Sequence, residues 1–108
     1  MHIAYVTFDE VNHYVVERMA PVGVTVEPCP APDPPDGKFD GYVCDLDHWP
    51  TEVRDRLIRY LSAEPVPLPI AVHSYSFGDE QVAALRRNGI QVHQRLEPGL
   101  FESFLSWG

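Results

Sequence analysis

Cysteines and long apolar runs are scarce in this 108-residue sequence. Its two cysteines, Cys29 and Cys44, are isolated and form no CxxC spacing, which favours small buried residues over a disulfide. No apolar run approaches the ~20 residues that span a bilayer. The first residues show neither a basic region nor a small-residue cleavage site. We therefore expect a cytoplasmic protein with no membrane-spanning segment.

Positive charge is also scarce. Eight lysines and arginines stand against sixteen acidic residues, and the formal net charge is −8. A field of this sign repels nucleic acid and anionic membrane surfaces, so we expect neither as a partner. Residues 7–10, at the end of the first expected strand, contain no glycine. They therefore lack the phosphate-binding loop of nucleotide and flavin sites.

What the sequence does contain is an alternation of strand and helix patterns. Runs rich in β-branched and aromatic residues predict strands over 2–8, 24–29, 39–46, 70–74 and 90–96. Helical spacing of apolar residues and helix-start signals predict helices over 9–19, 50–62 and 78–87, with a short last helix opening at Pro98. With 44% apolar residues, the pattern fits a single α/β domain over residues 1–108.

Residues 28–37 interrupt this alternation with five prolines in eight positions. Proline lacks an amide donor and disfavours helix in the residue before it, so we expect an extended connector here. At about 3.1 Å per residue it would reach roughly 30 Å, more than the length of a strand. A strip of the sheet near strands one and three would then lose its helical cover. Either the proline segment packs over this strip, or the strip is exposed and is an interface candidate for a partner.

Four segments, taken in order, resemble the receiver domain of response regulators. Residues 39–50 are similar to the strand that ends on the phospho-accepting aspartate and to its proline-closed loop. Residues 70–75 resemble the fourth strand, which ends on Thr or Ser, and 78–89 resemble the helix that follows it. Residues 95–98 resemble the Lys-Pro segment after strand five. The resemblance implies a flavodoxin-like, three-layer α/β fold with a five-stranded parallel sheet of order 2-1-3-4-5, in which the proline-rich connector replaces the helix between strands two and three.

The resemblance also implies where a phosphorylation site would lie. Asp45 and Asp47 are both candidate acceptors, because neither has the family spacing to Pro50. Pro50 lies one residue too far from Asp45 and one residue too close to Asp47. The candidate switch hydroxyl is Ser74, preceded by His73. Weak candidate Mg²⁺ ligands are Asp9, Asp45 and Asp47.

Two departures argue against this chemistry. Thr7 and Phe8 occupy the strand-one positions where a receiver has acidic residues that hold Mg²⁺. Glu97 replaces the lysine that pairs with phosphoryl oxygens, and its negative charge would repel them. We therefore expect a degenerate or pseudo-receiver that has no catalytic residues and is not an enzyme. It would need no cofactor, and Mg²⁺ only if it accepts phosphate.

Other functions stay open at the strand ends. One alternative is an atypical receiver that is phosphorylated on Asp45. An aspartate with His48 and His73 has the donor types of a metal site, and Asp, His and Ser together suggest a hydrolase. For contact with a protein partner or a second copy, the candidate residues are Phe39, Tyr42, Trp49, Arg86 and Arg95.

Overall fold

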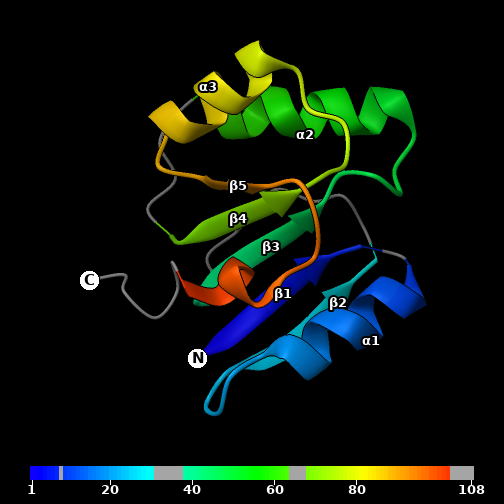
Figure 1. Ribbon diagram of the computed structural model, residues 1–108, viewed down its shortest axis with the longest axis vertical. Helices are drawn as coiled ribbons and strands as arrows, with labels where there is room; N and C mark the ends of the chain where they lie inside the picture. Colours follow the sequence, from blue (N-terminus) through cyan, green and yellow to red (C-terminus); the bar gives the residue numbers. More distant parts are fainter. Residues whose placement is uncertain (8, 31–37, 64–67, 103–108) are drawn as a thin grey trace.

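The computed structural model describes residues 1–7, 9–30, 38–63 and 68–102. Its elements, in chain order, are β1 (His2–Val6), α1 (Glu10–Met19), β2 (Thr25–Cys29), β3 (Gly41–Asp45), α2 (Thr51–Ala63), β4 (Ile70–His73), α3 (Asp79–Arg87), β5 (Gln91–His93) and a 3₁₀-helix, η1 (Pro98–Phe101). The predicted alternation is confirmed (Figure 1). β5 ends three residues earlier than predicted, at His93, and the last helix begins as a 3₁₀ turn.

The strands form one parallel sheet of order β2-β1-β3-β4-β5, as predicted. In the register of β1 with β2, Tyr5 lies opposite Pro28. Asp45 on β3 lies opposite His73 on β4, which lies opposite His93 on β5. The sheet thereby brings these polar residues together where the strands end.

Helices cover both faces of the sheet, which gives the three predicted layers (Figure 1). The apolar core under α2 and α3 includes Leu57, Ile58, Leu61 and Leu85. The core on the opposite face joins Val16 of α1 to Leu100 and Phe101 of η1, over strand residues such as Ile3 and Val43. No helix in the described ranges combines the length and the apolar character needed to cross a bilayer.

Local signals explain where the helices begin and end. The Asp9 carboxylate accepts a hydrogen bond from the Asn12 backbone amide at 2.8 Å, which caps the first turn of α1. α3 stops before Gly89, whose φ of +79° lies in the left-handed region that glycine adopts easily. The Asn88 side chain donates to the Leu61 carbonyl at 2.8 Å and ties the end of α3 to α2.

The exposed strip expected near strands one and three is absent from the described part of the sheet. Ala4 and Val6 of β1 are 0% and 2% exposed, and Tyr42 of β3 is 4% exposed. The Phe39 ring lies edge-on against Tyr42, with 5.7 Å between ring centroids. Of the two alternatives, cover from within the chain agrees with this burial, whereas a strip left exposed for a partner does not. The proline-rich connector lies largely outside the described residues, as does Phe8.

Candidate functional site

The carboxyl ends of the strands bring several predicted site residues to one edge of the sheet. Asp45, His73 and His93 are neighbours in the registers of β3, β4 and β5. Alternate residues of a strand face the same side, so Asp45 and His73 share the face of Val43 and Ala71. This is the face that α1 and η1 cover.

The Asp45 carboxylate is the centre of the site and is completely buried. Its Oδ2 accepts hydrogen bonds from the Thr7 hydroxyl at 2.8 Å and from the Asn12 side-chain amide at 3.3 Å. The same oxygen lies 2.6 Å from His48 Nδ1. Its Oδ1 accepts from the Asp47 backbone amide at 2.9 Å. Oδ2 thus has three polar neighbours for its two lone pairs, whereas Oδ1 accepts one hydrogen bond from the described residues and keeps acceptor capacity.

These donors also set the protonation state of Asp45. Burial alone would raise the pKa of its carboxyl group, because it disfavours the charged form. The Asp47 amide, the nearby His73, and the hydrogen bonds from Thr7 and His48 outweigh burial and lower the pKa below its ordinary value. Asp45 is therefore an ionised hydrogen-bond acceptor at neutral pH.

His48 bridges two carboxylates. Its Nδ1 lies 2.6 Å from Asp45 Oδ2, and its Nε2 lies 3.3 Å from Asp9 Oδ2. The Asn12 side-chain nitrogen also lies 3.3 Å from Nδ1, so which ring nitrogen donates a hydrogen bond depends on the tautomer of His48. The sequence places His48 among the strand-end residues but gives no sign that it links Asp9 to Asp45.

Asp47 belongs to a second, adjoining network. It accepts hydrogen bonds from the Ser74 hydroxyl at 2.6 Å and from the Tyr75 amide at 3.0 Å. Arg54 of α2 donates to the Ser74 hydroxyl at 3.2 Å and to the Ser76 carbonyl. The network fastens the loop after β3 to the loop after β4, with the candidate switch hydroxyl inside it. No sequence signal identified Arg54 or Asn12 as parts of the site.

His73 is paired with a tyrosine inside the protein. The Tyr5 hydroxyl and His73 Nε2 lie 2.6 Å apart, and both side chains are buried. Burial raises the pKa of Tyr5 well above its ordinary value, so the phenol stays protonated. Its hydroxyl therefore donates a hydrogen bond to His73 Nε2. Burial also lowers the pKa of His73, despite the nearby Asp45 and Asp47. His73 is therefore neutral at pH 7, with its proton on Nδ1.

Glu97 belongs to a different cluster from Asp45. Its carboxylate lies 2.8 Å from His93 Nδ1 and 3.5 Å from Arg95 Nε. The hydrogen bond with His93 is the main cause that lowers the pKa of Glu97. These are its hydrogen-bond and ion-pair partners among the described residues, so the structure does not join Glu97 to the other predicted site residues.

The predicted interface residues fall into three environments. Arg86 and Arg95 are exposed, whereas Phe39 and Trp49 are half-buried against the core under α2 and α3. Tyr42 is buried in that core. The prediction of Tyr42 as an interface residue is corrected by this burial, since its ring offers a partner almost no surface.

Comparison with known proteins gives matches among solved structures alone. No protein-family model matches the sequence, and no curated protein does. A response regulator receiver protein from Pseudoalteromonas atlantica superposes with a TM-score of 0.68 at 12% identity, over 97% of this chain and 93% of its own. The ChxR receiver domain from Chlamydia trachomatis gives 0.63 at 17% identity, over 97% and 98%. A protein from Burkholderia pseudomallei described as pilus assembly-related gives 0.63 at 18%, over 97% and 86%.

The chain has the fold of a response-regulator receiver domain. The likeness covers nearly the full length of both chains in the two receiver structures. It agrees with the sheet order and with the resemblance carried by residues 39–50 and 70–98. At 12–18% identity it shows the fold alone.

Within this receiver fold, a leucine stands where the acceptor spacing falls. Asp45 is one residue too far from Pro50 and Asp47 is one residue too close, so the usual spacing falls on Leu46. The Leu46 side chain is completely buried in the core under α2 and α3. The two aspartates that flank it serve the networks described above.

The residues present do not fit the Mg²⁺ site that the receiver fold implies. Mg²⁺ needs nearly octahedral oxygen ligands, mostly carboxylates and water. Thr7 replaces a strand-one acid and donates to Asp45, while Asp9 caps α1. The His48 ring lies between the carboxylates of Asp9 and Asp45 and occupies the space where a Mg²⁺ ion would meet both. Asp45 Oδ2 is already surrounded by Thr7, Asn12 and His48.

Proposed function

We propose that this chain is a receiver-like signalling domain that acts by contact with another protein, or with a second copy, and not by aspartyl phosphorylation. The carrying observation is the Asp45 carboxylate, which is completely buried. It accepts hydrogen bonds from Thr7, Asn12 and the Asp47 amide, and it lies 2.6 Å from His48 Nδ1. A phospho-acceptor must place a free oxygen in line with the phosphoryl donor. Asp45 would first have to lose the partners that hold it.

Two further positions support this proposal. Leu46, at the family spacing from Pro50, has no oxygen to accept a phosphoryl group and lies in the core. Glu97, in place of the lysine, carries a negative charge and is engaged with His93. Both changes remove a group that would stabilise or accept phosphate.

The proposal includes the absence of enzymatic activity. A serine nucleophile needs a histidine base within hydrogen-bond reach. The Ser74 hydroxyl instead donates to the Asp47 carboxylate, and His73 accepts from Tyr5. The described contacts therefore favour a structural role for both residues over hydrolysis.

We expect no phosphorylation when the protein is incubated with acetyl phosphate and Mg²⁺. The burial and hydrogen bonding of the Asp45 carboxylate and the misfit of the Mg²⁺ site are the physical reasons. Intact-mass spectrometry measures the phosphoryl adduct, and amide NMR spectra recorded with beryllofluoride report any response without covalent transfer. A conventional receiver serves as the positive control.

Variants make this test decisive. Glu97→Lys restores the missing cation and is expected to remain unphosphorylated, because Asp45 stays buried and hydrogen-bonded. A stoichiometric adduct on the wild-type protein that disappears in Asp45→Asn would overturn the proposal and favour an atypical receiver that uses Asp45.

A second candidate function is the binding of a transition-metal ion. Asp45, Asp47 and His73 each offer one ligand atom, and these atoms lie within 4.8 Å of one another. An imidazole ligand favours ions such as Zn²⁺ over Mg²⁺. Binding would compete with the hydrogen bonds that these side chains already make.

Thermal unfolding in the presence of Zn²⁺ tests this second candidate. If the three residues hold the ion, Zn²⁺ raises the unfolding midpoint by several degrees while Mg²⁺ does not. The rise disappears in His73→Gln and persists in His93→Gln, a control outside the group. An unchanged midpoint with Zn²⁺ removes metal binding as a candidate.

A further inference from the structure

Helix α1 carries apolar side chains on its outer face as well as on its buried face. Val16 is completely buried against the sheet. On the other side, Val11 is 71% exposed, Tyr14 is 60% exposed and Val15 is 36% exposed. Val22, in the turn after the helix, is fully exposed. An apolar patch of this kind on a surface helix marks a candidate contact surface.

The outer residues have the spacing of a helix-docking seam. Val11, Val15 and Arg18 of α1 follow one another at intervals of four and three residues, and Val22 lies beyond the end of the helix at Met19. This spacing keeps side chains on one stripe of a helix, where they can meet the side chains of a second element. The Arg18 guanidinium lies over the Tyr14 ring at 5.5 Å, which extends the stripe across the helix.

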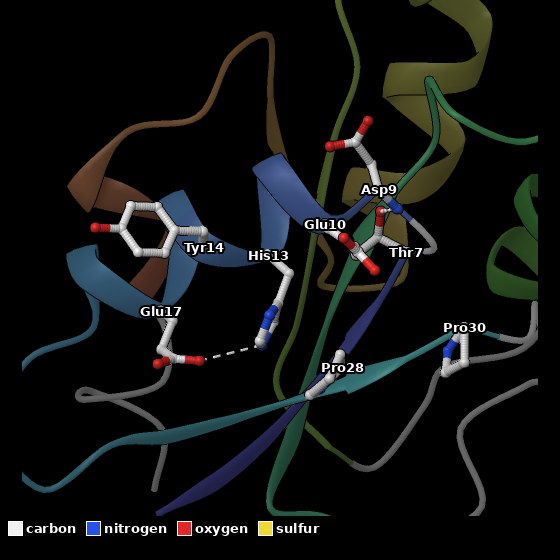
Figure 2. Close-up of a pocket in the computed structure, with 8 residues that line it drawn as sticks. All are labelled: Thr7, Asp9, Glu10, His13, Tyr14, Glu17, Pro28 and Pro30. Carbon is white, nitrogen blue, oxygen red and sulfur yellow. Dashed lines mark hydrogen bonds and ion pairs between the residues drawn. The ribbon is translucent and has the colours of Figure 1, made fainter.

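A groove of about 510 Å³ runs beside this stripe, between α1 and the end of β2. Figure 2 shows Tyr14 and Glu17 at one end, Glu10 and Asp9 at the other, and His13 between them. Three carboxylates therefore line a single groove whose opposite wall is formed by prolines of the β2 end.

The positive charge inside the groove is smaller than the negative charge. His13 Nε2 lies 3.3 Å from the Glu17 carboxylate, and Asp9 interacts with His48. Glu10 is exposed, and within the described ranges no cation pairs with it. The groove is thus suited to an incoming cationic side chain.

We propose that the outer face of α1 and this groove bind an amphipathic segment of a partner protein that carries lysine or arginine beside aliphatic residues. Its aliphatic side chains would cover Val11, Tyr14 and Val15, while its cations would reach Glu10 and Glu17. This inference rests on the proposed function and specifies the chemistry of the partner.

The negative charge of this surface favours a basic partner segment over a second copy, nucleic acid or anionic lipid. A second copy would bring the same acidic groove and a net charge of −8 against this one, which opposes close approach. Nucleic acid and anionic lipid are repelled for the same reason. A basic amphipathic segment satisfies both the apolar stripe and the carboxylates.

A synthetic peptide with leucines at every third and fourth position and lysines elsewhere tests the inference. We expect it to bind the full chain, with amide NMR shift changes confined to α1 and β2. The same peptide with glutamate in place of each lysine should not bind. Replacing Val11 and Val15 by serine should weaken binding of the lysine peptide at unchanged net charge.

A matched pair of variants separates a built site from general attraction between opposite charges. Glu10→Gln with Glu17→Gln is expected to weaken binding about five- to tenfold. Asp79→Asn with Glu80→Gln removes the same charge from the first turn of α3 and should leave binding unchanged. Equal weakening by both pairs overturns the inference, as does a failure of the lysine peptide to bind. A dimer in light scattering that shields α1 overturns it in favour of a second copy.

The outcome can be distinguished from a failure of the proposed function. A phosphoryl adduct on Asp45 contradicts the proposed function whatever the peptide does. Absence of both an adduct and peptide binding contradicts only the assignment of α1 as the docking surface.

Discussion

Replacing Asp45 by alanine is expected to lower the free energy of unfolding by about 3 kcal/mol. The carboxylate is the common acceptor of Thr7, Asn12, His48 and the Asp47 amide, and it lies in the protein interior. Without it, these donors lose their partner, and Asp9 is the one carboxylate that still contacts His48 among the described residues. Urea denaturation followed by circular dichroism measures the change.

An exposed aspartate and the pH dependence of stability show whether this loss comes from the buried, ionised carboxylate of Asp45. Asp55→Ala, on the exposed face of α2, should change the free energy of unfolding by less than about 0.5 kcal/mol.

Because the pKa of Asp45 is lowered by folding, its stabilisation is present above the ordinary carboxyl pKa of about 4 and is lost as the pH falls through the lower folded value. Wild-type and Asp45→Asn stabilities should therefore converge in acid. If Asp45→Ala lowered the free energy of unfolding by less than about 1 kcal/mol at pH 7, the description of Asp45 as a buried acceptor of several hydrogen bonds would be contradicted.

Replacing Leu46 by aspartate, which restores a carboxylate at the acceptor spacing, is expected to cost about 4 kcal/mol of stability or more. Leu46 is 0% exposed and packs in the core under α2 and α3. A carboxylate there would have to be neutralised or drawn out of the core. We expect a partly or wholly unfolded variant that acetyl phosphate does not modify. Chemical denaturation and intact-mass spectrometry measure both results.

Leu46→Met is the matched control, since it keeps an apolar side chain of similar volume. It should cost less than about 1.5 kcal/mol. If Leu46→Asp instead folded with wild-type stability and accepted a phosphoryl group, the position would still be a working acceptor site. The core role assigned to Leu46 would then be wrong.

Much of the fold was predictable because strand and helix signals in this chain are local. The β-branched run of β1, the cap at Asp9 and the Asn88-Gly89 stop each act within a few residues of where they stand. The sheet order came from the resemblance and is confirmed. β5 was predicted too long, because an apolar residue such as Leu96 does not show where pairing with β4 ends.

The site was predictable in position more than in role. Parallel strands place Asp45 beside His73 whatever their side chains do. Which donors surround Asp45 depends on Asn12, one turn into α1, and on the direction in which His48 turns. The burial of Tyr42 likewise depends on packing against Phe39, which its local sequence does not specify.

Pro28 has a consequence for how the protein behaves at high concentration. β2 is an edge strand of the described sheet, and the Thr25 amide and the Cys29 carbonyl both bond toward β1. Because backbone groups alternate along a strand, the backbone of Pro28 faces outward, where an amide is missing. An incoming strand would find no donor at that position, so this edge resists sheet-to-sheet aggregation. A partner that approaches the adjacent groove therefore binds through its side chains and not by extending the sheet.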